Sequence, residues 1–320
     1  MRFLTVIVTL LSSLCAHAAE SSDVKVVAIT QIVAHPALDA VRKGALDELE
    51  ARGYIEGRNL KVIYQSASGN PTTAAQIAQQ FVGLKPDVIF AISTPSAQTV
   101  QSASRGTIPL VFAAISDPQK ADIVDSEQKP GRNTTGVTDR APLTKQLQFV
   151  RDVMPQLKKL AFLYNPGEDN SVAALQVFKD LAKASGIELK VYAASKTAEV
   201  SAAARRALEE CEAVFVPTDN TIASAFEAVV KTAQGLRKPV FASDTILVGK
   251  GAVAMIGQDY THIGREAGML LSRVLAGEPA GSIPVVEPGL YELAINKKAA
   301  EAARVNLPKT MIDAAQKVYP

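Results

Sequence analysis

Five apolar, strand-like runs in this sequence each stop abruptly in a short cluster of small polar residues. The runs with their polar ends lie at residues 88–98, 110–118, 160–171, 213–221 and 239–245. A continuous apolar run is typical of a parallel strand that is buried on both faces of its sheet. Open α/β sheets bind ligands at the carboxyl ends of such strands, which is where the polar clusters fall. The pattern therefore predicts a receptor for a small polar molecule.

Helical segments separate these runs, so that strands and helices alternate along most of the chain. We expect strands at 24–30, 60–65, 88–92, 110–114, 160–164, 188–192, 213–216 and 240–242. We expect helices at 37–52, 72–84, 96–104, 143–153, 172–184, 198–209, 224–234 and 261–275, then short extended pieces at 283–286 and 291–295 and a helical tail. Such alternation produces right-handed crossovers and a parallel sheet. Because roughly 300 residues exceed one core, we predict an α/β protein with two doubly wound parallel-sheet lobes.

The first residues have the composition of a secretory signal peptide. Arg2 precedes an apolar stretch at 3–14, and Ala16-His17-Ala18 forms a small-residue cleavage site. An apolar stretch of this length is shorter than the roughly 20 residues that a membrane span needs. We therefore predict residues 1–18 as a cleaved signal peptide and a periplasmic location for the mature protein.

The two cysteines bear on anchoring and on disulfides. Cys15 allows lipid attachment as an alternative, which we favour less because Leu14 stands where a small residue is usual in such signals. Cys211 would be alone in the mature chain, so no internal disulfide is expected. Its place before an apolar run indicates a packed thiol rather than a nucleophile.

The charge balance and the missing motifs exclude several classes of function. The chain has 34 Lys and Arg against 32 Asp and Glu, and loss of Arg2 with the signal peptide leaves 33 − 32 = +1. A near-neutral surface offers no electrostatic case for nucleic acid. No G-x-S-x-G, H-E-x-x-H, P-loop or G-x-G-x-x-G motif is present, and His35 has no partner that indicates a metal. We expect neither an enzyme nor a cofactor, although an acid pair such as Asp219 and Asp244 could transfer protons.

The segment Ser93-Thr94-Pro95-Ser96 opens a predicted helix directly after a buried strand. The first N–H groups of a helix lack intrahelical partners and carry partial positive charge. Pro95 suits the first helical positions, and the hydroxyls can donate beside the backbone. We predict that this turn receives a ligand carboxylate. The alternative, that one hydroxyl only caps the helix, is worth about 1 kcal/mol and stays open.

A ligand ammonium group needs anionic or carbonyl acceptors, because burying it unpaired is costly. Asp219 and Asp244 follow neighbouring predicted strands of the second lobe, and Asp117 is expected to face them from the first. A zwitterion could then lie across the cleft, with its carboxylate toward the first lobe and its ammonium toward the second. Each Asp could instead be a cap or a turn former.

Eight short motifs are spread over nearly the whole mature chain. They are HPALDA at 35–40, GYIEGRN at 53–59, AISTPSAQ at 91–98, SDP at 116–118, GVTD at 136–139, VPTDNT at 216–221, FASDT at 241–245 and GQDY at 257–260. Together they resemble the bacterial ABC-transporter substrate-binding proteins of the type that includes streptococcal tryptophan-binding lipoproteins. The resemblance implies a type I periplasmic-binding-protein fold, in which three crossing strands form a hinge near 138–142, 257–261 and 284–288.

The resemblance also implies limits for the lobes and a set of ligand-binding residues. The first lobe would comprise 23–139 and 261–285, and the second 140–260 and 286–320. The expected ligand-binding residues are Gln31, His35, Ser93, Thr94, Ser96, Ser116, Asp117, Asp139, Asn170, Ser171, Asp219, Asn220, Thr221, Ser243 and Asp244.

The function implied is that of an extracytoplasmic solute-binding protein of an ABC importer. It would act as a monomer, bind an amino-acid-like ligand by hinge closure and serve a permease in the inner membrane. By analogy with the tryptophan-binding relatives, the ligand would be aromatic or branched and apolar. The alternatives are a periplasmic sensor subunit for a membrane receptor, or a binder of a sugar or a purine.

Overall fold

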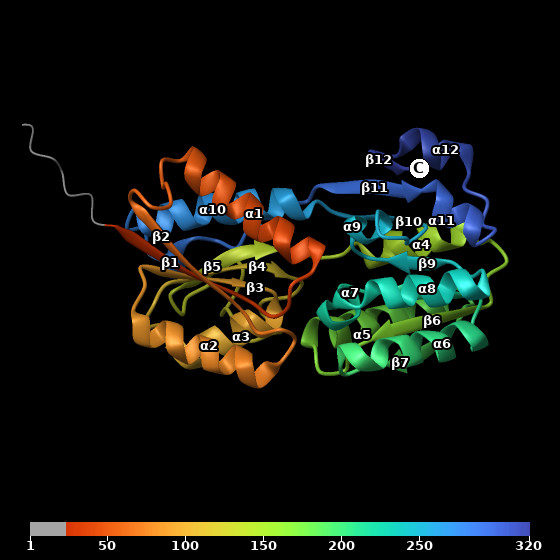
Figure 1. Ribbon diagram of the computed structural model, residues 1–320, viewed down its shortest axis with the longest axis horizontal. Helices are drawn as coiled ribbons and strands as arrows, with labels where there is room; N and C mark the ends of the chain where they lie inside the picture. Colours follow the sequence, from red (N-terminus) through yellow and green to blue (C-terminus); the bar gives the residue numbers. More distant parts are fainter. Residues whose placement is uncertain (1–23) are drawn as a thin grey trace, which may run out of the picture.

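The computed structural model describes residues 24–320, so the predicted signal peptide at 1–18 and Cys15 lie outside the described residues. It consists of two α/β lobes side by side, each built around a parallel sheet (Figure 1). The predicted fold class is thereby confirmed. None of the helices within 24–320 is long and apolar enough to cross a membrane.

The first lobe contains a five-stranded parallel sheet in the order β2-β1-β3-β4-β5. Its strands are β1 (Lys25–Gln31), β2 (Leu60–Ser66), β3 (Val88–Ile92), β4 (Leu110–Ile115) and β5 (Thr134–Thr138). One face is covered by α1 (Pro36–Ala51) and α10 (Tyr260–Leu275), and the other by α2 (Pro71–Leu84) and α3 (Thr94–Ser104) (Figure 1). Every residue of β3 and β4 is buried, as their continuous apolar sequences predict.

The second lobe contains a four-stranded parallel sheet in the order β7-β6-β8-β9. Its strands are β6 (Lys159–Tyr164), β7 (Glu188–Ala193), β8 (Ala213–Val216) and β9 (Val240–Ala242). Among its larger helices, α4 (Leu143–Val153) packs against α5 (Asp169–Ala184), and α6 (Val200–Glu210) packs against α8 (Phe226–Leu236). The short helix η1 (Thr197–Glu199) precedes α6, and the short helix α7 (Asn220–Ser224) precedes α8. Asp219 caps the start of α7, and a break at Ala225 separates α7 from α8, which begins at Phe226. The helix predicted at 224–234 therefore begins at the wrong residue.

A small third sheet, of order β10-β11-β12, was not predicted from the sequence. It joins β10 (Ala254–Gln258), β11 (Tyr291–Asn296) and β12 (Lys317–Tyr319), with α9 (Thr245–Val248), η2 (Ala280–Ser282), α11 (Lys297–Ala302) and α12 (Lys309–Ala314) nearby in the chain. The extended piece expected at 283–286 forms no strand, because only Val286 makes a bridge, to Val137. β10 and β11 pair antiparallel across a gap that holds all of α10. Pairing across such a separation leaves no local sequence pattern.

The two lobes have separate hydrophobic cores. The first draws on residues between 27 and 137 and again between 260 and 283, and the second on residues between 147 and 255 and between 294 and 307. Helix α10 belongs to the first core because it packs against α1. The two helices are so close that a Cβ at Gly264 would collide with the Val41 carbonyl. The chain thus passes between the lobes after β5, after β10 and before β11.

Candidate functional site

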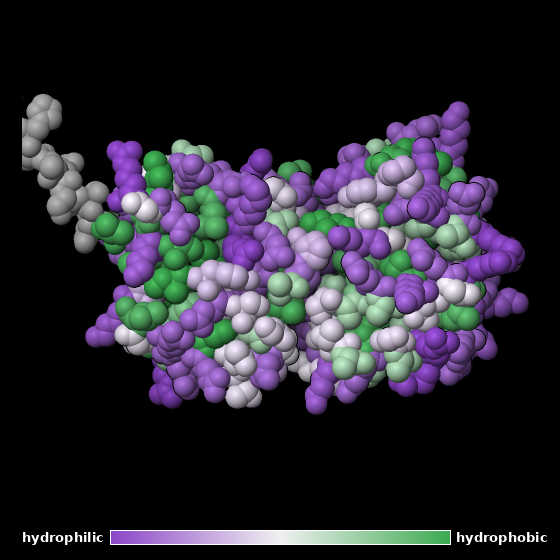
Figure 2. All heavy atoms as spheres, viewed as in Figure 1, coloured by the Kyte–Doolittle hydropathy of each residue, from purple (hydrophilic) through white to green (hydrophobic). Residues whose placement is uncertain are grey.

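The carboxyl ends of both large sheets face the same furrow between the lobes, which is visible on the face shown in Figure 2. At its centre lies a chamber of about 10 Å³. The chamber is lined by His35, Leu38, Ala114, Ser116, Asp139, Asn170, Thr218, Asp219, Asn220, Asp244 and Tyr260. Two wider cavities, of about 460 Å³ and 250 Å³, adjoin it, and Asn170 lines all three.

On the side of the second lobe, the polar side chains bind one another. Glu168 accepts hydrogen bonds from the backbone N–H groups of Asn220 and Thr221, both at 3.0 Å, and from the Thr221 hydroxyl at 2.8 Å. Asp219 accepts from the Asn165 N–H at 2.6 Å, from the Ser171 hydroxyl at 2.7 Å and from the Ile222 N–H at 2.9 Å. These carboxylates tie the loops after β6 and β8 together.

Asp219 is therefore a loop anchor and a helix cap, which is the alternative that the sequence left open. Its carboxylate oxygens already accept three hydrogen bonds within its own lobe. Burial, with repulsion from Glu168 as the second cause, raises its pKa to about 8. The charge that it can offer a ligand ammonium is correspondingly reduced.

On the side of the first lobe, helix N-termini reach the furrow without side-chain caps. α3 begins after Ser93 and α1 after His35, and neither residue caps its helix with a side-chain hydrogen bond. Ser93 adopts φ 87° and ψ 156°, a region that only glycine enters easily. By contrast, Asn70 caps α2 and Asp259 caps α10. The uncapped N–H groups at α3 suit an anion.

One tyrosine hydroxyl joins the acidic residues of the two lobes. Tyr260 Oη lies 2.7 Å from Asp244 Oδ1 and 3.1 Å from Asp139 Oδ2, and all three residues are buried. Ser116 donates to the other oxygen of Asp139 at 2.8 Å. Burial raises the pKa of Asp139 and raises that of Asp244 to about 7.

Two further side chains of the chamber are acceptors without a donor. The Asn220 amide nitrogen donates to Glu168 at 2.5 Å, which turns its oxygen toward His35 Nε2 at 3.4 Å. Nε2 must then carry the ring hydrogen, and burial lowers the pKa of His35, so Nδ1 is a bare acceptor. The Asn170 amide nitrogen donates to the Thr218 carbonyl at 2.8 Å, which leaves its oxygen as an acceptor. Both acceptors are buried and have no partner within residues 24–320.

Lys and Arg side chains line the two wider cavities, and none is among the residues that line the chamber. Lys120, Arg140 and Lys145 line the cavity of about 460 Å³ together with apolar residues such as Leu143 and Val177. Lys120 pairs with Asp117 at 2.9 Å, and Arg140 binds Glu127 and Glu287. In the part of the chain that the structure describes, no group of three or more His, Cys, Asp or Glu is placed to hold a metal ion.

The predicted residues fall into three groups. Those that line the chamber are His35, Ser116, Asp139, Asn170, Asp219, Asn220 and Asp244. Thr94 and Asp117 line the adjoining cavity of about 250 Å³. Those that line none of these cavities are Gln31, Ser93, Ser96, Ser171, Thr221 and Ser243.

Some residues of the last group have structural partners instead. Ser243 binds the Gln146 side chain at 2.9 Å inside the second lobe, and the Gln31 amide donates to Asp39 and to the Val33 carbonyl. The ligand-binding residues expected from the sequence include neither Glu168 nor Tyr260. A carboxylate followed by Asp169 and Asn170 looks like an ordinary helix start, so no sequence signal marked Glu168.

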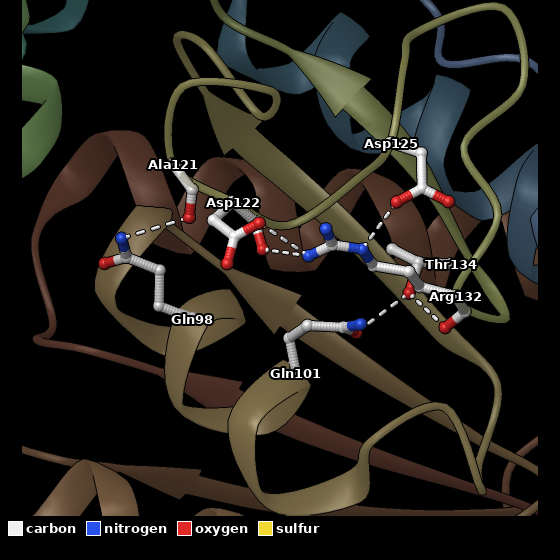
Figure 3. A network of polar contacts seen from close by, with 7 residues as sticks. All are labelled: Gln98, Gln101, Ala121, Asp122, Asp125, Arg132 and Thr134. Atoms are coloured by element: carbon white, nitrogen blue, oxygen red, sulfur yellow. Dashed lines mark hydrogen bonds and ion pairs between the residues drawn. The ribbon is translucent and has the colours of Figure 1, made fainter.

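Contacts across the furrow hold the lobes together at its edge. The Gln98 amide donates to Asp169 of the second lobe at 2.7 Å and to the Ala121 carbonyl of the first at 3.2 Å. Figure 3 shows that Ala121 belongs to the loop that Arg132 secures through Asp122 and Asp125, beside Gln101 and Thr134. The contact with Asp169 is therefore made from a fixed first-lobe surface.

The sequence profile of one protein family, described as ABC transporter substrate binding protein, matches residues 26–319. The chain belongs to this family. Members of the family are extracytoplasmic, bind small molecules, work with ABC transporters and are not enzymes. The predicted resemblance and the expectation of a non-enzyme are confirmed.

Individual relatives agree with this assignment. The chain is 37% identical over 283 residues to the tyrosine-binding protein of Clostridioides difficile, covering 88% of this chain and 82% of the relative. A crystal structure from Streptococcus pneumoniae, of an ABC domain in complex with L-Trp, superposes with a TM-score of 0.88 at 32% identity, covering 92% and 99% of the two chains. The ligand-free, open structure of a Clostridium difficile substrate-binding protein with adhesive properties gives 0.68 at 33% identity, again covering 92% and 99%.

Proposed function

We propose that this protein is the solute receptor of an ABC importer and that it binds an α-amino acid with an aromatic side chain between its lobes. One observation carries the choice of an amine. The chamber contains the carboxylates of Asp139 and Asp244 and the bare acceptors of Asn170 and His35, but no Lys or Arg. An ammonium group offers three hydrogens and a positive charge, which suit a chamber lined by acceptors and by two acidic side chains.

The rest of such a ligand has complementary surroundings next to the chamber. Thr94, at the uncapped start of α3, and Lys120 line the cavity of about 250 Å³ and suit a carboxylate. Leu143, Ala174 and Val177 supply apolar surface in the cavity of about 460 Å³. The relatives named for tyrosine and found with L-Trp support an aromatic side chain.

Closure of a hinge is part of the proposal. The chamber has room for about one water, so an amino acid enters only if the lobes part. Two relatives of nearly equal identity support such a motion, because the complex with L-Trp superposes far better than the open, ligand-free structure. The same proposal includes a signal peptide at 1–18, a periplasmic location, a monomeric state and an inner-membrane permease as partner. It also includes the limits of the lobes, which are 23–139 with 261–285 for the first and 140–260 with 286–320 for the second.

A thermal-shift screen of the exported chain against the twenty L-amino acids tests this function. A ligand at a hundred times its dissociation constant adds about 2.7 kcal/mol of stability, so tyrosine or tryptophan should raise the midpoint clearly. Matched analogues of tyrosine then separate its groups. N-acetyl-L-tyrosine lacks the ammonium and should not bind, whereas tyramine, which lacks only the carboxylate, should bind weakly. If a sugar or a purine raises the midpoint and no amino acid does, the proposal is wrong.

A further inference from the structure

The acidic side chains that meet at the Tyr260 hydroxyl belong to different lobes. Asp139 follows β5 of the first lobe, Tyr260 packs in the first core, and Asp244 follows β9 of the second lobe. A phenol has one hydrogen, so Tyr260 donates to one carboxylate at a time. With Asp244 at 2.7 Å as the acceptor, the 3.1 Å contact with Asp139 is a hydrogen bond only if Asp139 brings a proton of its own.

We propose that Asp139 and Asp244 share an extra proton when the lobes close without ligand, and that the ammonium group of an arriving ligand expels it. The exchange is balanced, because the carboxyl O–H bond breaks, the proton passes to water, and the cationic ammonium takes its place. No electrons are transferred. This inference rests on the proposed function, since it needs a ligand that carries an ammonium group, and it adds a proton to the binding equilibrium.

Several charged groups face this pair. Arg140 acts on Asp139 from the hinge, but it is already bound to Glu127 and Glu287. Asp219 and Glu168 lie in the loops of the second lobe, and His35 is kept neutral by burial. The pKa of Asp244, raised to about 7 by burial, means that an extra proton persists at neutral pH.

The proton on the Asp139 and Asp244 pair differs from any proton on Asp219. Asp219 receives its hydrogen bonds from Asn165, Ser171 and Ile222, all in its own lobe, so its surroundings there persist when the lobes part. The Asp139 and Asp244 pair is assembled across the furrow. An independent sign that the same chamber takes a hydrogen donor is the Asn170 oxygen, which is buried and unpartnered.

Calorimetric titration of the exported chain with L-tyrosine and L-tryptophan tests the inference. The titrations are run at one pH in two buffers of different ionisation enthalpy, because the difference in heat counts the protons exchanged. We expect release of up to one proton near pH 6 and almost none near pH 8, where the ligand still carries its ammonium group. Affinity should fall by up to tenfold for each pH unit below about 7.

Variants assign the proton to the pair. Asp244→Asn and Asp139→Asn should each abolish the release, while Asp313→Asn, on the exposed surface of α12, should leave it unchanged. Tyr260→Phe keeps both carboxyl groups but removes the hydroxyl that donates to Asp244 and thereby lowers its pKa. The variant should therefore retain the proton release and shift it to higher pH, which provides a test even if an Asp variant folds poorly.

The outcomes separate this inference from the proposed function. If tyrosine or tryptophan binds to the wild-type chain with the same heat in both buffers at pH 6, the inference is overturned while the function stands. The same holds if the release persists in Asp244→Asn and Asp139→Asn. If no amino acid binds at any pH, the proposed function itself fails.

Discussion

The two sides of the furrow are built in opposite ways. In the second lobe, Glu168 and Asp219 bind the polar groups of the loops around them. In the first lobe, the helices after His35 and Ser93 start without side-chain caps, and Ser93 holds a strained backbone. Buried polar groups that satisfy one another make a rigid surface, whereas strain accumulates where a ligand is to be bound. The loops of the second lobe are therefore held by their own hydrogen bonds, with the Asn170 oxygen left as a free acceptor, while the first lobe offers uncapped helix starts and a strained residue to a ligand.

The largest effect should follow from breaking the network of the second lobe. Glu168→Ala leaves the N–H groups of the buried Asn220 and the half-buried Thr221 without acceptors, and should lower the free energy of unfolding by about 3 kcal/mol. Denaturant titration measures it. Glu212→Ala is the matched control, because Glu212 also accepts two backbone hydrogen bonds but is exposed, and its loss should cost about 1 kcal/mol or less. Equal losses for the two variants would contradict a rigid second-lobe surface.

The acidic pair gives the next effect, on the pH dependence of stability. A carboxyl whose folded pKa lies near 7, above its unfolded value near 4, binds its proton more tightly when folded, so stability rises as pH falls through this range. Without ligand, the chain should have a higher thermal midpoint at pH 5 than at pH 8. Asp244→Asn should reduce this slope. A slope that Asp244→Asn leaves unchanged would show that other groups set it, such as Asp219, whose pKa burial raises to about 8.

Relief of strain in the first lobe should be smaller. Ser93→Gly should stabilise the chain by about 1 to 2 kcal/mol, because glycine adopts φ 87° with ψ 156° without a steric cost. Arg105→Gly, at φ 47° and ψ 38° at the far end of the same helix, should gain less, because Arg105 sits in the milder left-handed region. Chemical denaturation compares the two. A loss of stability in Ser93→Gly would show that its side chain matters more than its backbone.

The smallest effect should come from the contact between the lobes at Gln98. Gln98→Ala removes the hydrogen bond to the exposed Asp169 and the longer one to the Ala121 carbonyl, so the free energy of unfolding should fall by about 1 kcal/mol or less. The average separation of the lobes should nevertheless increase, and small-angle X-ray scattering measures it through the radius of gyration. Gln148→Ala is the control, since its bond to Asp152 lies within α4. An identical radius of gyration in both variants would exclude Gln98 from closure.

Much of the fold was readable from the chain because its signals are local. The runs at β3, β4 and β8 are apolar at every position, and each was placed within a residue of its observed bounds. The third sheet was missed because β10 and β11 pair across the whole of α10, a relation that no local pattern carries. Short helices such as α7 were misplaced because a cap, rather than a period, sets their start.

For the site, the sequence identified the right region but did not show which carboxylates bind neighbouring loops and which are available to a ligand. It placed polar residues at strand ends, and parallel strands necessarily bring those ends to one edge, so seven of the predicted residues line one chamber. Which carboxylate is free depends on its neighbours in space. The Asp219 carboxylate is occupied by Asn165, Ser171 and Ile222, while the Asp244 carboxylate has only Tyr260 as a hydrogen-bond partner among the described residues. That distinction, like the shared proton of Asp139 and Asp244, arises from contacts between distant segments, and only the tertiary structure decides it.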